Sequence, residues 1–209
     1  IIPGIKVDLG VEPLALHAEE KITKGIDGLR ERFAEYAQLG ARFAKWRAVI
    51  TIGENIPSRA CIHANAHAMA RYAALAQEAD IVPIVEPEVL IEGDHSLERS
   101  YEVVSQTLKT LFEELASQNV ALEGLILKTS MVITGKSSPK QSSVSEVAEL
   151  TIKCLLENVP KNLAGVVFLS GGQGDEQATA HLSTMNQKIA LPWPLTFSYS
   201  RAIQNPVLK

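Results

Sequence analysis

The chain has 209 residues, of which 46% are hydrophobic and 21% are charged, and its formal net charge is −4. The apolar fraction excludes a disordered chain, and the acidic balance excludes a nucleic-acid partner held by bulk electrostatics. Because no apolar run approaches the roughly 20 residues of a membrane span, we also expect no membrane partner. Two distant cysteines, Cys61 and Cys154, indicate a reducing, cytoplasmic setting rather than a disulfide framework.

Six short stretches rich in Val, Ile, Leu and Phe predict buried parallel strands. In chain order they span residues 2–7, 44–50, 82–90, 122–128, 165–170 and 195–199. Amphipathic segments between them predict helices over 26–39, 58–78, 96–117, 145–157 and 176–187, with caps at Asp94, Ser143 and Asp175. Strand alternating with helix predicts a parallel sheet covered by helices.

Each predicted strand ends near a conspicuous polar residue, and most of these residues recur about every forty positions. They are Lys6, Lys45, Glu86, Lys128, Ser170 and Arg201. Such a period, with functional side chains at the strand ends, is typical of a (β/α)8 barrel. A doubly wound sheet would be expected to show a G-x-G-x-x-G turn after its first strand, and the sequence has no such turn. Six units are visible where a closed barrel has eight, so we expect one domain over 1–209 that lacks the first two units and is incomplete at both ends.

Lys128 closes a run of aliphatic residues, an unusual position for a charge. One interpretation is a lysine whose ammonium reaches solvent. The other is a neutral amine, favoured by burial and neighbouring cations such as Lys45 and Lys6, that attacks a carbonyl and forms a Schiff base.

Paired charges on two other strands favour the second interpretation. Glu86 and Glu88 share one face of a strand, which suits a general acid/base and a partner that neutralises the lysines. Lys45 and Arg47 likewise share a face, with Trp46 packing on the other side, and two inward cations predict an anionic substrate.

The segment from Ser170 through Gly171 and Gly172 follows a predicted strand and precedes a helix, which is typical of an anion-binding turn. It lies one strand before Ser200 and Arg201, as in the phosphate site of barrel enzymes. His63 and His67 form a possible metal pair, but no third ligand is evident, so we expect no metal; the other histidines, His17, His95 and His181, are interpreted as surface or capping residues.

Six strings, in order along the whole chain, carry a family resemblance: GIKVD, FAKWR, IVEPEVL, LEGLILK, FLSGGQ and LTFSYSRA. Together they resemble class I (Schiff-base) fructose-bisphosphate aldolase. The resemblance implies a (β/α)8 barrel, no metal or other cofactor, a phosphorylated sugar as substrate, and a homotetramer. The reaction it implies is reversible cleavage of fructose 1,6-bisphosphate into dihydroxyacetone phosphate and glyceraldehyde 3-phosphate.

The resemblance also implies residue roles. Lys128 corresponds to the Schiff-base lysine, Glu86 to its acid/base, Lys45 to the group that polarises the carbonyl, and Glu88 to a supporting charge. The phosphate next to the ketone would be held by Ser170, Gly171 and Arg201, with the backbone of Gly172 and Ser200, and the far phosphate by Lys6 and Arg47.

Three departures from the family accompany this assignment. Thr129 and Ser130 follow Lys128 where the family has proline and then asparagine or serine, and Ser200 stands where glycine is common. The family's N-terminal part, with a catalytic aspartate, and its C-terminal tyrosine have no counterpart in the sequence. Two alternatives therefore stay open: another Schiff-base aldolase of the transaldolase or deoxyribose-phosphate type, and a catalytically silent fragment that serves as an interaction module.

Overall fold

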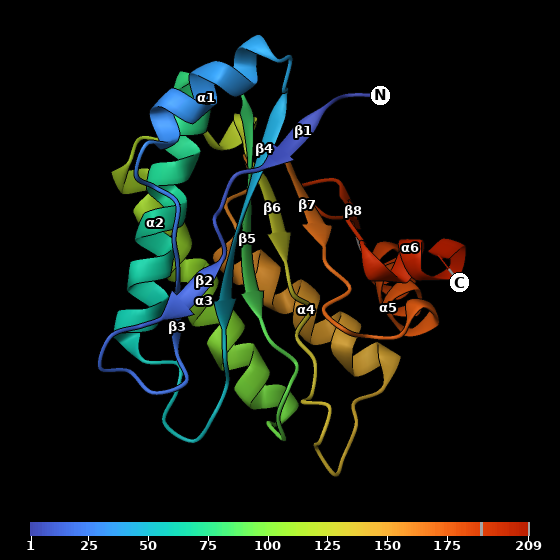
Figure 1. Cartoon of the computed structure of the whole chain (residues 1–209). Helices are drawn as coiled ribbons and strands as arrows, with labels where there is room; N and C mark the ends of the chain where they lie inside the picture. Colours follow the sequence, from blue (N-terminus) through green and yellow to red (C-terminus); the bar gives the residue numbers. More distant parts are fainter. Residues whose placement is uncertain (189, 209) are drawn as a thin grey trace.

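A parallel sheet of six strands forms the centre of the computed structural model (Figure 1), which describes residues 1–188 and 190–208 without the side chains of Arg201, Asn205 and Pro206. The strands lie in the order β1, β4, β5, β6, β7, β8, and every neighbouring pair is parallel. Their bounds are Gly4–Lys6, Phe43–Ile50, Val82–Val89, Ile126–Thr129, Gly165–Phe168 and Leu195–Phe197. Because spatial order follows chain order, each connection advances by one strand in the same direction, as in a (β/α)8 barrel. The predicted fold, with six of the eight strand–helix units, is confirmed.

Six helices accompany the strands, and Figure 1 shows α2 running alongside β4 and β5, with α5 and α6 beside β8. Their bounds are α1 Leu29–Gln38, α2 Arg59–Glu78, α3 Leu97–Ser117, α4 Val144–Asn158, α5 Asp175–Lys188 and α6 Arg201–Leu208. The hydroxyls of Ser58, Ser96 and Ser143 accept backbone N–H groups at the starts of α2, α3 and α4. Within the described part of the chain, none of the helices has the length and apolarity that a membrane crossing requires.

The layer between sheet and helices is filled by side chains from alternate strand positions. Trp46 of β4 is fully buried, and its ring stacks on Tyr72 of α2 with the centroids 5.6 Å apart. The ring of Phe33 of α1 packs against the same tyrosine, with the ring centroids 6.1 Å apart. Because successive strand residues face opposite sides, this packing turns Lys45 and Arg47 toward the other face of the sheet, as expected.

A small antiparallel hairpin, formed by β2 (Val11–Pro13) and β3 (Lys21–Thr23), was not predicted, because each of these strands is short and contains a single aliphatic residue. It is tied to the barrel by Asn65 of α2, whose Nδ2 donates to the Lys21 carbonyl at 2.8 Å and whose Oδ1 accepts the Thr23 N–H at 3.2 Å. The Thr23 hydroxyl then donates to the Arg47 carbonyl at 2.8 Å. The hairpin therefore secures β4.

Several predicted boundaries were wrong. Residues 122–124 form a 3-10 turn (η1, Leu122–Gly124) rather than strand, because the Leu125 N–H bonds back to the Leu122 carbonyl. Helix α1 begins at Leu29 instead of residue 26, after Gly28 with a left-handed φ of 65°. Asp94 does not cap α3, since Ser96 does, and Asp175 is already the first residue of α5. β1 and β8 are shorter than predicted.

Candidate active site

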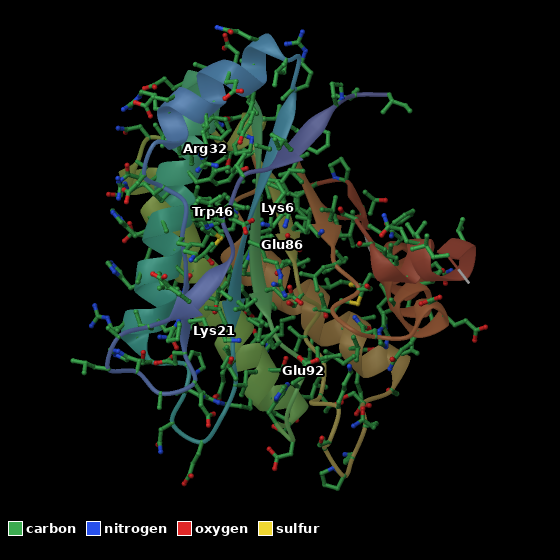
Figure 2. All side chains as sticks on the ribbon, viewed as in Figure 1. Lys6, Lys21, Arg32, Trp46, Glu86 and Glu92 are labelled. Carbon is green, nitrogen blue, oxygen red and sulfur yellow. The ribbon has the colours of Figure 1, made fainter. Side chains whose placement is uncertain are left out.

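A cavity of ≈ 390 Å³ opens on the sheet face opposite Trp46 and is lined by residues of the three strands β4, β5 and β6 and of the segments that follow β7 and β8. It is lined by Arg47, Glu86, Glu88, Lys128, Leu169, Ser170, Gly171, Ser198 and Ser200. Figure 2 labels Lys6 on β1, Trp46 on β4, Glu86 on β5 and Glu92 beyond the end of β5. A strand contributes several residues to the cavity because every second side chain faces it.

Glu86 lies at the centre of the charged groups, between two lysines from neighbouring strands. Its Oε1 is 3.1 Å from Lys128 Nζ on β6, and its Oε2 is 2.9 Å from Lys45 Nζ on β4. The carboxylate side chain is only 5% exposed, and those of Lys128 and Lys45 are 13% and 21% exposed. Lys45 and Glu86 lie within their strands rather than at the predicted exits, because β4 and β5 continue for several residues past them. One carboxylate thus contacts both amines.

Glu88 and Arg47 form a second ion pair at the same face, through Arg47 Nε and Glu88 Oε2. Burial acts to lower the pKa of the Arg47 guanidinium, but the hydrogen bond and charge of Glu88, with the charges of Glu86 and Asp8, more than offset it and raise that pKa. Arg47 is therefore a fixed cation whose end reaches the cavity.

The loop after β7 narrows the cavity with a turn that only glycine adopts without strain. Gly171 has φ +59° and Gly172 has φ +90°, and a Cβ on Gly171 would come within 2.8 Å of the Leu169 side chain. The Gln173 N–H closes the turn on the Ser170 carbonyl at 2.9 Å. The Gln173 side chain is fixed in turn by His181 of α5, whose Nδ1 lies 2.7 Å from Gln173 Oε1. A small, braced turn of this kind suits an anion.

Ser130 joins the strands that carry Glu86 and Lys128. Its buried hydroxyl accepts the Val89 N–H and donates to the Val89 carbonyl, each at 2.9 Å. Val89 is the last residue of β5, and Ser130 follows β6 directly. Ser130, which follows Lys128 by two residues, therefore holds the C-terminal ends of β5 and β6 together.

Not every residue singled out from the sequence lines the cavity. Lys45 reaches it only through Glu86, Gly172 lies behind Gly171, and Lys6 is half-exposed and paired with Asp8 at 2.7 Å. The side chain of Arg201 lies outside the described residues, so the structure places only its backbone, at the start of α6.

Two residues of this region were not predicted from the sequence. Ser198 lines the cavity together with Ser200. Their spacing of two residues, which places both on one face of an extended segment, could have indicated this. Asp8, also two residues from a predicted site residue (Lys6), is buried against Lys6 and lies 4.0 Å from Lys45 Nζ. A carboxylate on a segment between strands carried no periodic pattern to identify it.

Two of the three histidines interpreted as surface or capping residues are buried instead. His181 is fully buried and His95 is 9% exposed, and burial lowers the pKa of both imidazoles. His63 and His67 each contact a carboxylate oxygen of Glu114 on α3 at 2.9 Å. Across the residues that the structure describes, no group of three or more His, Cys, Asp and Glu side chains is arranged to hold a metal ion.

Comparisons with known proteins agree with one another. The model of the family described as "Glycolytic: Fructose-bisphosphate aldolase class-I" matches residues 1–209. A probable fructose-bisphosphate aldolase class 1 of Xanthomonas campestris is 63% identical over the whole chain, which covers 63% of that relative. A fructose-bisphosphate aldolase of Dictyostelium discoideum is 47% identical over 98% of the chain and 58% of its own length.

A solved structure gives the same result in three dimensions. Fructose-bisphosphate aldolase from Plasmodium falciparum, crystallised with TRAP and a small-molecule inhibitor, superposes with a TM-score of 0.98 at 46% identity. The match covers all of this chain and 60% of the Plasmodium chain. The chain thus spans about three fifths of the length of the relatives it matches.

Proposed function

Because this chain belongs to the class I fructose-bisphosphate aldolase family, we propose that its cavity is the Schiff-base site for reversible cleavage of fructose 1,6-bisphosphate. The products are dihydroxyacetone phosphate and glyceraldehyde 3-phosphate, and the role is glycolytic. One observation carries the proposal: a buried carboxylate, Glu86, contacts the amines of both Lys128 and Lys45, beside a glycine turn suited to phosphate.

The nucleophile is Lys128. Its amine adds to the ketone carbon, and loss of one water leaves a protonated imine joined to the lysine. Glu86, 3.1 Å from this nitrogen, is within reach to take the amine's proton and to protonate the departing hydroxyl. Because the Glu86 carboxylate contacts both amines, it can accept a proton in one step and donate it in the next without changing its position.

The imine then acts as the electron acceptor. The carbon–carbon bond between the two triose halves breaks, its electron pair moves into the imine to give an enamine, and the hydroxyl of the leaving half loses its proton as the aldehyde forms. Lys45 polarises this centre, and Glu88 supports its charge network. Reprotonation of the enamine carbon and addition of one water release dihydroxyacetone phosphate and restore the amine.

Two groups of residues, in and around the cavity, recognise the two phosphates. The phosphate next to the ketone is held by the turn Ser170, Gly171 and Gly172, with the Ser200 backbone and Arg201. The far phosphate is held by Lys6 and Arg47, which belong to neighbouring strands. Charge-assisted hydrogen bonds of this kind contribute about 1.5–3 kcal/mol each, so both phosphates matter for turnover.

We further propose a homotetramer working in the cytoplasm as one barrel domain. Both cysteines are free and buried, and burial raises the pKa of each thiol to about 11, which suits a reducing compartment but does not require one.

The proposal is tested by incubating the intact protein with fructose 1,6-bisphosphate and excess chelator while triose phosphate release is followed. We expect steady release, and a loss in kcat/KM of about tenfold or more when either phosphate is absent, since one charge-assisted contact exceeds the 1.4 kcal/mol of a tenfold change. Cleavage of other ketose phosphates in preference would identify a different Schiff-base aldolase. Absence of turnover with every ketose phosphate would leave only the interaction-module alternative.

A further inference from the structure

Asp8 is a charged side chain that neither the sequence pattern nor the proposed mechanism uses, although it is buried next to the site. It lies just after β1, and its side chain is 3% exposed. Burial of a carboxylate is unfavourable unless its oxygens are paired and hydrogen-bonded. The contacts that compensate this cost indicate what the residue does.

Both oxygens of Asp8 are occupied. Oδ1 lies 2.7 Å from Lys6 Nζ and accepts the Gly10 N–H at 3.2 Å. Oδ2 accepts the Arg47 N–H at 3.3 Å and lies 4.0 Å from Lys45 Nζ. The bond to Gly10 fixes the local turn, and the contacts of Oδ2 direct the second oxygen at β4, the strand that carries two proposed site cations.

Lys45 therefore lies between two carboxylates from opposite sides. Glu86 Oε2 approaches its ammonium at 2.9 Å from β5, and Asp8 Oδ2 lies at 4.0 Å on the side of β1. A long lysine side chain has many rotamers, and a single partner leaves much of that freedom. Two carboxylates on opposite sides restrict the ammonium to one place.

In the absence of substrate, Asp8 also balances the charges of the whole cluster. The cations are Lys6, Lys45, Arg47 and Lys128, and the carboxylates are Asp8, Glu86 and Glu88. When Lys128 is neutral, as a nucleophile must be, three cations face three carboxylates. Without Asp8, three cations would share two glutamates.

We propose that Asp8 is a positioning residue of this site, which holds the Lys45 ammonium opposite Glu86 and keeps it directed at the bond that is cleaved. This inference rests on the proposed function, because it assigns a partner to a residue of that mechanism. Asp8 acts through Lys45 and not on Lys128, whose contact with Glu86 is independent of it. Its removal should therefore impair carbon–carbon cleavage more than imine formation.

The test compares these two steps in the intact protein carrying Asp8→Asn. Asparagine keeps the size and one acceptor oxygen for the Gly10 N–H, but loses the charge. We expect turnover of fructose 1,6-bisphosphate to fall by about tenfold or more, since a displacement of about 1 Å of a catalytic group can cost about 10²-fold in rate. Borohydride trapping of dihydroxyacetone phosphate on Lys128 should stay within about threefold of the wild type.

Glu12→Gln is the matched control. Glu12 is an exposed carboxylate of the same segment, 3.8 Å from Lys24, and its substitution should change neither measurement. Asp8→Glu is the second variant, to be used if Asp8→Asn does not fold, because it keeps the charge and displaces it by one methylene; it should show the same separation of cleavage from trapping.

Three outcomes are possible refutations, and each refutes a different statement. Turnover within threefold of the wild type refutes the positioning role. Parallel loss of turnover and trapping, in a variant with an unchanged unfolding midpoint, refutes the specific action through Lys45. Absence of trapping in the wild type instead refutes the proposed function on which the inference rests.

Discussion

Replacing Glu86 by glutamine is the perturbation with the clearest expected consequence. The substitution conserves shape and removes one charge from a carboxylate that contacts Lys128 at 3.1 Å and Lys45 at 2.9 Å. The amide oxygen still accepts from one ammonium, but the amide NH2 then faces the other, donor against donor. Depending on how the amide turns, either Lys128 loses the carboxylate at 3.1 Å or Lys45 keeps only the more distant Asp8, at 4.0 Å.

The size of the effect follows from burial and contact. Removing one partner of a buried ion pair typically costs 3–5 kcal/mol of unfolding free energy. The side chains of Lys128 and Lys45 are 13% and 21% exposed, so water can still solvate them. The expected loss of unfolding free energy therefore lies near the lower end of this range, at about 3 kcal/mol. The turnover number should fall more steeply, by about 10²–10⁴-fold, because the group proposed to transfer protons is lost.

Urea unfolding and a coupled assay of triose phosphate release measure the two effects separately. Glu92→Gln is the matched control: Glu92 follows β5, is 60% exposed and lies 3.7 Å from Lys136, so its loss should change neither. If Glu86→Gln kept its turnover number within about tenfold of the wild type, the assignment of proton transfer to Glu86 would be wrong.

Two further predictions concern the supports of the site. Asn65→Ala leaves the buried Thr23 N–H without a partner and leaves the Lys21 carbonyl with only the Cys61 thiol as a donor, at 3.6 Å. Since a buried N–H without a partner costs about 1–3 kcal/mol, urea unfolding should show a loss in this range, and a loss below about 0.5 kcal/mol contradicts the clamp. Burial lowers the pKa of His181 in the folded state from 6.5. Below that pH the unfolded chain therefore binds more protons than the folded chain. The free energy of unfolding should decline there by up to about 1.4 kcal/mol per pH unit. His181→Gln should make the decline between pH 7 and 5 shallower, and equal slopes would refute this contribution.

Much of the fold was predictable because parallel strands that are buried on both faces consist of short aliphatic runs. The order of those runs, together with the regular spacing of Lys45, Glu86 and Lys128, was enough to predict the barrel. The alternation of strand side chains also predicted that Trp46 packs beneath the helices while its neighbours face the site.

The remainder depends on contacts between distant residues, which periodicity does not record. The hairpin is tied to the barrel by Asn65, 44 positions from Lys21 along the chain. Asp8 is buried only because β4 brings Arg47 and Lys45 to it, 39 and 37 residues further along the chain. His181 is a polar residue on a helix, a pattern typical of the surface, but it is buried against Gln173, a contact that the sequence pattern does not reveal.

The central claim is that the amine of Lys128 forms a covalent bond with the sugar, and reductive trapping tests it directly. The intact protein is incubated with dihydroxyacetone phosphate and sodium borohydride, digested, and analysed by peptide mass spectrometry. We expect irreversible inactivation and a reduced adduct on Lys128, with no adduct in Lys128→Ala. An adduct on another lysine, or equal trapping in Lys128→Ala, would contradict the account.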